Sequence, residues 1–303
     1  MQLAMIGLGK MGANMTRRLL QAGVSVVGYN RSAAKVQELS SVAGFSPAGS
    51  LADAVGQLPL PRVVWLMLPS GEPTAEAVEQ LGGLLQPGDI LVDGGNANYH
   101  DSQARARLLA AKQIEFVDAG VSGGVWGLQN GYCLMLGGSP QAVETLLPAV
   151  HALAPAADRG WAHLGPAGAG HFSKMIHNGI EYGMMQALAE GFALLQGKQE
   201  FDYDLAEIAE LWRHGSVVRS WLLDLMAGFL QQDQQLDTIS PFVADSGEGR
   251  WTVEESIHQG LPAPVLTLAL QMRFASQDEQ SYTNRLLSKM RQAFGGHAVV
   301  EKS

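Results

Sequence analysis

Short apolar runs alternate with longer amphipathic stretches through the first half of the chain. Six runs with the length of buried strands lie at 2–6, 24–29, 62–68, 89–93, 114–117 and 133–136. Helical spacing of apolar residues occurs between several of them, near 74–85, 98–112 and 140–153. Alternating strands and helices predict an α/β domain of Rossmann type, with a doubly wound, mainly parallel sheet.

From Gly168 onward the strand patterns disappear. Helical patterns follow at about 170–197, 204–215, 217–231, 252–259, 264–275 and 279–294. Thr252 followed by Glu255 predicts a capping box at the start of one of these helices. We therefore expect a Rossmann-type dinucleotide-binding domain over 1–166. An all-α second domain over 167–303, for substrate binding and oligomerisation, follows it. A helical half without a sheet of its own is expected to pack on another copy of the chain.

The first strand runs directly into a glycine-rich turn, and a helical pattern then continues to Gln21. In a G-x-G-x-x-G turn, Gly7 permits the tight bend, Gly9 lets a pyrophosphate approach the backbone, and Gly12 lets the helix pack on the strand. The helix N-terminus adds N–H groups and the positive end of a dipole. We expect cofactor contacts from Gly7, Leu8, Gly9, Lys10, Met11 and Gly12.

The second strand ends in Asn30-Arg31-Ser32, with Lys35 one turn later. An NAD site usually has a carboxylate here for the ribose 2′-hydroxyl, and this chain has none. A guanidinium and a hydroxyl suit a 2′-phosphate instead. The pattern favours NADP over NAD, although a solvated loop after an edge strand would look the same.

Three further strand ends carry residues suited to ligand contact. They are Leu68-Pro69, Gly94-Gly95-Asn96 and the stretch 119–124, which includes Ser122, Gly123 and Gly124. Ligands of open α/β sheets bind beyond the carboxyl ends of strands. We expect Leu68, Pro69 and Asn96 near the cofactor, and Asn96 and Ser122 as polar contacts.

Four polar residues stand at offsets 0, 3, 4 and 7 of the long helical stretch after Gly168: Lys174, His177, Asn178 and Glu181. These offsets lie on one face of a helix. Their apolar neighbours Met175, Ile176, Ile180, Met184 and Met185 predict a mostly buried helix. A buried lysine and glutamate are costly unless they are paired or used in chemistry. A surface stripe or a structural ion pair is the alternative interpretation.

Composition narrows the class of protein. The net charge of −9 argues against nucleic acid or an anionic membrane as partner. Cys133 is the single cysteine, so neither a disulfide framework nor a cysteine metal site is expected. There is no metal-ligand spacing, no signal-peptide pattern and no apolar run of transmembrane length. We expect a cytoplasmic protein that needs no metal.

These motifs together resemble the short-form 6-phosphogluconate dehydrogenases, within the β-hydroxyacid dehydrogenase superfamily. The resemblance runs from residue 3 to about residue 298. The superfamily's phosphate-loop glycines, substrate turn and lysine helix match Gly7, Gly9, Gly12, Ser122-Gly123-Gly124, Gly168, Gly170, Lys174 and Asn178. The narrower family's features match His177, Glu181, Tyr182, Trp251-Thr252, Arg273 and the stretch from Arg291 to His297.

The resemblance implies the reaction: oxidative decarboxylation of 6-phosphogluconate to ribulose 5-phosphate and CO₂ in the pentose phosphate pathway, with NADP or NAD as oxidant. Lys174 would be the general base for the C3 hydroxyl, and Glu181 would protonate C1 of the enediol. The substrate's carboxylate and hydroxyls would be held by Asn96, Ser122, Gly123, Gly124, His177 and Asn178. Tyr182 and Arg273 would hold the phosphate. Arg291 and His297 would enter from another subunit of a dimer or tetramer.

The chain departs from the family pattern at two places. Ser246 and Glu248 stand where long-form enzymes have a lysine and a threonine for the phosphate. Either that loop is displaced, or Arg250 and Arg273 compensate for the glutamate. Val125 and Trp126 replace two carboxylates that usually follow the serine-glycine turn. Two other functions stay open: a dehydrogenase of a small β-hydroxyacid such as 3-hydroxyisobutyrate, and a non-catalytic dinucleotide-binding module.

Overall fold

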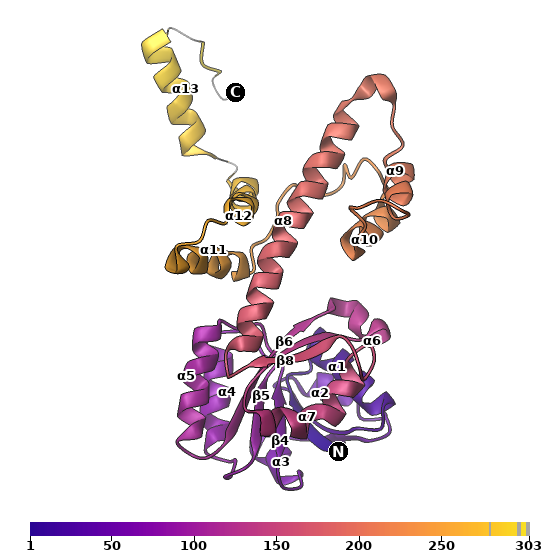
Figure 1. Cartoon of the computed structure of the whole chain (residues 1–303), viewed down its shortest axis with the longest axis vertical. Helices are drawn as coiled ribbons and strands as arrows, with labels where there is room; N and C mark the ends of the chain where they lie inside the picture. Colours follow the sequence, from indigo (N-terminus) through magenta and orange to yellow (C-terminus); the bar gives the residue numbers. More distant parts are fainter. Residues whose placement is uncertain (279, 296–297, 301–303) are drawn as a thin grey trace. The chain divides into compact units, whose positions relative to one another are not determined.

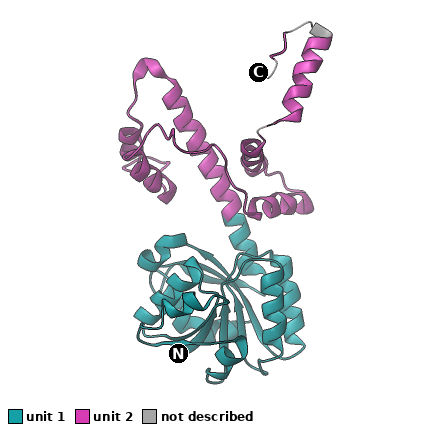
Figure 2. Cartoon of the chain, turned by 180° about the vertical axis from the view of Figure 1, so that it is seen from behind, with its two compact units in different colours: residues 1–177 teal, residues 178–303 magenta. Residues whose placement is uncertain are grey.

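In the computed structural model of the chain, residues 1–278, 280–295 and 298–300 are described. The chain divides into two compact units, residues 1–177 and 178–303 (Figure 2). The division falls inside the long helix α8 (Ala169–Gly197). The domain boundary expected at residue 166 stays a prediction.

The first unit is built on a sheet of eight strands in the order β3-β2-β1-β4-β5-β6-β7-β8 (Figure 1). The strands are β1 (Gln2–Ile6), β2 (Ser25–Tyr29), β3 (Phe45–Pro47), β4 (Val63–Leu66), β5 (Ile90–Asp93), β6 (Glu115–Ser122), β7 (Cys133–Gly137) and β8 (Trp161–Gly165). Every neighbouring pair is parallel except β6 and β7, which are antiparallel. The order of the first six strands is that of a Rossmann fold. This confirms the predicted fold class.

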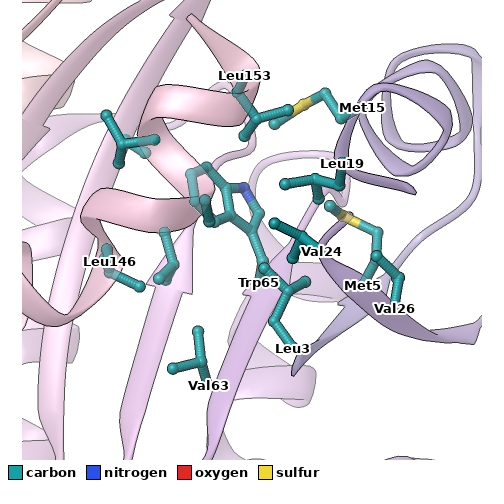
Figure 3. Packing of buried hydrophobic residues seen from close by; sticks show 14 of the residues in the cluster. Leu3, Met5, Met15, Leu19, Val24, Val26, Val63, Trp65, Leu146 and Leu153 are labelled. Carbon is teal, nitrogen blue, oxygen red and sulfur yellow. The ribbon is translucent and has the colours of Figure 1, made fainter. Parts of the chain in front are cut away.

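Helices cover both faces of this sheet. They are α1 (Lys10–Gln21), α2 (Ala33–Gln37), α3 (Leu51–Gly56), α4 (Glu72–Gly82), α5 (Tyr99–Ala110), η1 (Gly124–Trp126), α6 (Gly127–Asn130) and α7 (Pro140–Leu153). Leu3 and Met5 of β1 pack toward α1 and α7, around the fully buried Trp65 (Figure 3). Ala4 and Ile6 point to the other face, toward α3, α4 and α5. Burial on both faces explains why these strands are continuous apolar runs rather than alternating ones.

Helices make up the second unit. After the first turns of α8 come η2 (Gln199–Phe201), α9 (Leu205–Trp212), α10 (Trp221–Leu230), α11 (Glu248–Gln259), α12 (Pro264–Gln277) and α13 (Tyr282–Gly295). One small core joins α8, α9 and α10 around Phe192, Leu205 and Leu223. Another joins Tyr182 of α8 to Ala269 and Leu270 of α12. The helical second half is therefore as predicted.

Several local expectations need correction. Strands β3 and β8 have no counterpart in the sequence pattern, because β3 has only three residues and β8 is a largely exposed edge strand. Thr252 caps no helix: it lies inside α11 and its hydroxyl donates to the carbonyl of Glu248. The helix begins four residues earlier, after Gly247, whose φ of 95° favours glycine.

The predicted burial of α8 holds for only part of the helix. Met175 is buried, but Ile180, Met184 and Met185 are 40–49% exposed. The apolar pattern thus marks a face that this single chain does not cover. Within the described residues, no helix combines the length and the hydrophobicity needed to cross a bilayer.

Candidate active site

The turn after β1 has the geometry of a dinucleotide cradle. Gly7 has a φ of 97°, and a Cβ there would collide with the carbonyl oxygen of Met67. A Cβ on Gly12 would collide with the carbonyl oxygen of Gly7, whereas one on Gly9 would meet no atom within 4 Å. Space over Gly9 and a helix α1 without a side-chain cap leave the first-turn N–H groups suited to a pyrophosphate. The turn therefore fits a dinucleotide.

Asn30 holds this turn in place. Its Oδ1 accepts a hydrogen bond from the backbone N–H of Leu8 at 2.9 Å, and the N–H of Gly7 donates to the carbonyl of Tyr29 at 2.9 Å. Arg31 and Ser32 follow as exposed residues, while Lys35 forms a 2.9 Å ion pair with Glu38. The cationic group at this strand end that no carboxylate of the described residues neutralises is Arg31.

The next strand ends lie at the carboxyl edge of the same sheet. Leu68 and Pro69 follow β4, and Gly94-Gly95-Asn96 follows β5, with Asn96 exposed. The buried carboxylate of Asp93 accepts from the N–H of Gly95 at 3.2 Å and pairs with Arg105 at 2.8 Å. This buried ion pair orders the turn that carries Asn96. The sequence pattern did not reveal it.

Strand β6 leads into the Ser122-Gly123-Gly124 turn. Gly123 has a φ of 128°, and a Cβ on it would lie 3.3 Å from the ring of Tyr132. The hydroxyl of Ser122 lies 3.4 Å from Nε2 of His177 on α8. The structure thus brings Ser122 and His177 together. Val125 and Trp126, which replace the family's carboxylates, are exposed.

Tyr132, the residue beneath this turn, yields a prediction about alkaline stability. Burial raises the pKa of Tyr132 to about 12, against an opposing effect of Arg18. The folded protein therefore keeps a proton that the unfolded chain releases above pH 10, and stability falls between pH 10 and 12 by roughly 2–3 kcal/mol. Tyr132→Phe should lack this loss. Its stability at pH 7 should not fall, because the buried hydroxyl has no hydrogen-bond partner among the described residues.

Urea unfolding at pH 9, 10.5 and 12 measures this difference. Tyr203→Phe, at an exposed position, is the matched control. Equal alkaline losses in the parent protein and in Tyr132→Phe would contradict the assignment to Tyr132.

Strand β6 also positions the start of α8. Both oxygens of the fully buried Asp118 accept backbone hydrogen bonds, from the N–H of Gly168 at 2.6 Å and of His171 at 2.7 Å. Burial raises the pKa of Asp118, although His171 and these two N–H groups act to lower it. His171 in turn contacts the hydroxyl of Ser102 through Nδ1 at 2.7 Å. These buried contacts fix the first turn of the helix to the sheet.

Gly120 lies two residues after Asp118 on strand β6 and supports Lys174. A Cβ on Gly120 would lie 2.5 Å from Cβ of Lys174 and 2.9 Å from the carbonyl oxygen of Gly170. A Cβ on Gly170 would lie 2.6 Å from the carbonyl oxygen of Asp118. The helix therefore contacts the strand backbone directly, and the stem of Lys174 rests on Gly120. Lys174 is 9% exposed.

Asp118, Gly120 and Ser122 alternate along β6 and so share one face of it. They contact, in turn, the first turn of α8, Lys174 and His177. Ser122 was predicted from its motif, whereas Asp118 and Gly120 were not. The period-two spacing upstream of the serine was the available signal. The charge of Lys174 also reaches Cys133, where it opposes the rise in the thiol's pKa that burial causes.

The remaining residues of the helix motif belong to the second unit. Asn178 and Tyr182 are buried there and Glu181 is partly buried. The guanidinium of Arg273 stacks 3.5 Å above the ring of Tyr182, and its Nη1 donates to the carbonyl of Ala244 at 2.7 Å. Arg291 is exposed on α13, and His297 lies outside the described residues.

Ser246 and Glu248, which depart from the family pattern, have specific partners. Glu248 is 3% exposed, and its Oε2 accepts hydrogen bonds from Nδ2 of Asn178 and from the hydroxyl of Ser246. Arg250 is paired with Asp245 at 2.5 Å. Burial acts to raise the pKa of Asp245, but the N–H of Gly247 and the Arg250 guanidinium outweigh it and lower that pKa. Arg250 therefore has a carboxylate partner of its own, whereas none of the described carboxylates forms an ion pair with Arg273.

No group of three or more His, Cys, Asp or Glu side chains in the described part of the chain is arranged to hold a metal ion. The chemistry present is a dinucleotide turn and a buried amine beside a serine-glycine turn. Fold and site together define a nicotinamide-dependent oxidoreductase of the Rossmann class.

Comparison with known proteins narrows this class. Residues 2–162 match the NAD binding domain of 6-phosphogluconate dehydrogenase, and residues 170–299 match the C-terminal domain of 6-phosphogluconate dehydrogenase. The chain therefore belongs to the 6-phosphogluconate dehydrogenase family.

Three relatives illustrate the range of the family. An NAD(+)-dependent, decarboxylating 6-phosphogluconate dehydrogenase of Haloferax volcanii is 39% identical over 303 residues, covering 100% of this chain and 99% of the relative. An NADP(+)-dependent one of Bacillus subtilis is 35% identical, covering 95% of this chain and 64% of its own length. The Plasmodium falciparum enzyme's structure superposes with a TM-score of 0.84 at 28% identity, covering 100% of this chain and 66% of its own. The chain thus spans about two thirds of the longer relatives.

Proposed function

We propose that this protein catalyses the oxidative decarboxylation of 6-phospho-D-gluconate to D-ribulose 5-phosphate and CO₂, with NADP or NAD as oxidant, in the pentose phosphate pathway. The observation that carries the proposal is the buried Lys174, whose stem rests on Gly120 beside the Ser122–His177 contact. Lys174 also belongs to the lysine helix motif that the chain shares with the family. Family membership supports the same reaction.

The residues would act in sequence. Lys174 would take the proton of the C3 hydroxyl. A nicotinamide cofactor held at the Gly7–Gly12 turn would supply the oxidising chemistry, as the acceptor of the C3 hydride. The protonated amine would then give its proton to the C3 carbonyl oxygen while the C1–C2 bond breaks. C1 leaves as CO₂, and the electron pair of the broken bond forms the enediol between C2 and C3. Glu181, seven residues further along α8, would then protonate the carbon that lost CO₂, which is C2 of the substrate and C1 of ribulose 5-phosphate.

Substrate contacts follow from the resemblance. Asn96, Ser122, Gly123, Gly124, His177 and Asn178 would hold the carboxylate and hydroxyls, and Arg273, stacked on Tyr182, would hold the phosphate. Arg291 and His297 would come from another subunit. The exposed apolar side chains Ile180, Met184 and Met185 of α8 support a homo-oligomer.

Initial rates with 6-phosphogluconate test the function. We expect nicotinamide reduction and CO₂ release in equal amounts. Reduction with 3-hydroxyisobutyrate but not with 6-phosphogluconate would instead establish a dehydrogenase of small β-hydroxyacids and refute the proposal.

The cofactor preference rests on Arg31. Because Lys35 is paired with Glu38, Arg31 is the cation available for a 2′-phosphate. Arg31→Ala should raise KM for NADP by at least about tenfold, the effect of losing hydrogen bonds to a charged group, and leave KM for NAD within twofold. Arg107→Ala on α5, also exposed, is the control. A parent protein that prefers NAD, or equal effects on both cofactors, would contradict the NADP assignment.

A further inference from the structure

A continuous hydrogen-bond chain in the second unit links four residues, Asn178, Glu248, Ser246 and Tyr182, which we call the Glu248 chain. Glu248 accepts from Asn178 and, at 3.3 Å, from the hydroxyl of Ser246. The Ser246 hydroxyl lies 2.9 Å from the hydroxyl of Tyr182, which also accepts from the N–H of Ser246 at 3.4 Å. Every member except Ser246 is at least nine-tenths buried.

The carboxylate determines the direction of every bond in this chain. An ionised carboxylate only accepts hydrogen bonds, and negative charge is stabilised at the first residue of a helix, where Glu248 stands. Asn178 must therefore present Nδ2 to Glu248, and Ser246 must give its one hydroxyl proton to Glu248. Consequently Tyr182 is the donor in its contact with Ser246.

This direction decides what the chain can offer to a ligand. The amide oxygen of Asn178 is the end turned away from Glu248, and an amide oxygen accepts up to two hydrogen bonds. The single proton of Tyr182 is used by Ser246. Nearby, Arg250 is neutralised by Asp245, whereas Arg273 lies over the Tyr182 ring and has no carboxylate partner among the described residues.

We propose that Glu248 is a specificity-determining residue for the reaction proposed above. By directing the Glu248 chain, it makes Asn178 an acceptor for ligand hydroxyl groups and withholds the Tyr182 proton, so that Arg273 receives the phosphate without a hydrogen bond from Tyr182. A glutamate next to the phosphate position then weakens phosphate binding only slightly, because its carboxylate accepts hydrogen bonds from Asn178 and Ser246 and is not directed at the phosphate. This inference depends on 6-phosphogluconate being the substrate.

The Glu248→Gln variant should affect binding of the phosphate and binding of the hydroxyl groups of the ligand in opposite directions. A carboxamide of the same shape can donate as well as accept, so the direction of the chain is no longer determined and one negative charge is lost. With 6-phosphogluconate as substrate, inorganic phosphate should become a tighter competitive inhibitor by at least about threefold. Gluconate, which has the hydroxyls without the phosphate, should inhibit at least about threefold more weakly, and kcat should change less than threefold. Each expected shift corresponds to the gain or loss of one modest hydrogen bond.

Damage to the fold would weaken both inhibitors together, so shifts of opposite sign identify the specificity role. Ser246→Ala, at an exposed residue, releases the Tyr182 proton without changing Glu248 and should also tighten phosphate inhibition. Ser246→Ala is the variant that tests the proposal if Glu248→Gln does not fold. Glu254→Gln, on the exposed side of α11, is the control.

The outcomes separate this inference from the function on which it rests. A parent protein that releases no CO₂ from 6-phosphogluconate refutes both. If the parent is active, inhibition constants within twofold of the parent's, or a parallel weakening, refute the role of Glu248 alone.

Discussion

Lys174→Met should lower kcat for 6-phosphogluconate by about 10²- to 10⁴-fold, the usual contribution of a general acid–base group. Methionine keeps an unbranched stem of similar length, so the packing on Gly120 is retained and only the amine is lost. The affinity for the nicotinamide cofactor should stay within twofold, because the Gly7–Gly12 turn follows β1, whereas Lys174 lies on α8. Initial rates and a fluorescence titration with the reduced cofactor measure the two effects.

Lys198→Met provides the matched control. This lysine is exposed and paired with Glu200, so the same substitution should leave kcat unchanged. A Lys174→Met protein that retains more than a tenth of the parent's kcat would remove the amine from the mechanism. A protein that also loses cofactor binding would point to damage beyond the site.

The residues that the sequence identified best are those whose role depends on local geometry. Gly7 and Gly12 need a missing Cβ for reasons that a strand–turn–helix pattern already contains, and the structure shows the collisions that a side chain would cause. The start and end of α8 likewise follow from periodicity. The first-half strands were predictable because burial on both faces makes each of them a continuous apolar run.

Long-range contacts were not predictable in the same way. Asp118 and Gly120 matter because of α8, which follows about fifty residues later, and no local pattern states that contact. One hydrogen-bond partner of Glu248 is Asn178, seventy residues away, so the sequence could single out the glutamate without indicating what its carboxylate binds. Apolar periodicity also indicates which face of α8 needs to be covered, but not which partner covers it. Met184 and Met185 on that face are exposed in the single chain.

Gly120→Ala should lower kcat by about 10²-fold although it changes no chemical group of the site. The added Cβ would lie 2.5 Å from Cβ of Lys174, so the helix must move away from β6. A displacement of about 1 Å at a catalytic group costs on the order of 10²-fold in rate. The free energy of unfolding should fall by about 1–3 kcal/mol, as it does when a packed contact is overfilled.

Gly191→Ala adds the same methyl group to α8 at a position where a Cβ would meet no atom within 4 Å. It should raise stability by up to about 1 kcal/mol, because alanine favours a helix over glycine, and leave kcat unchanged. The pair therefore separates the added methyl from its contact with Lys174. If Gly120→Ala lowered stability but kept kcat within threefold of the parent's, the contact would stabilise the fold without positioning the amine. A loss of rate without a matching loss of cofactor affinity would show that Gly120 of β6 determines the position of the Lys174 amine.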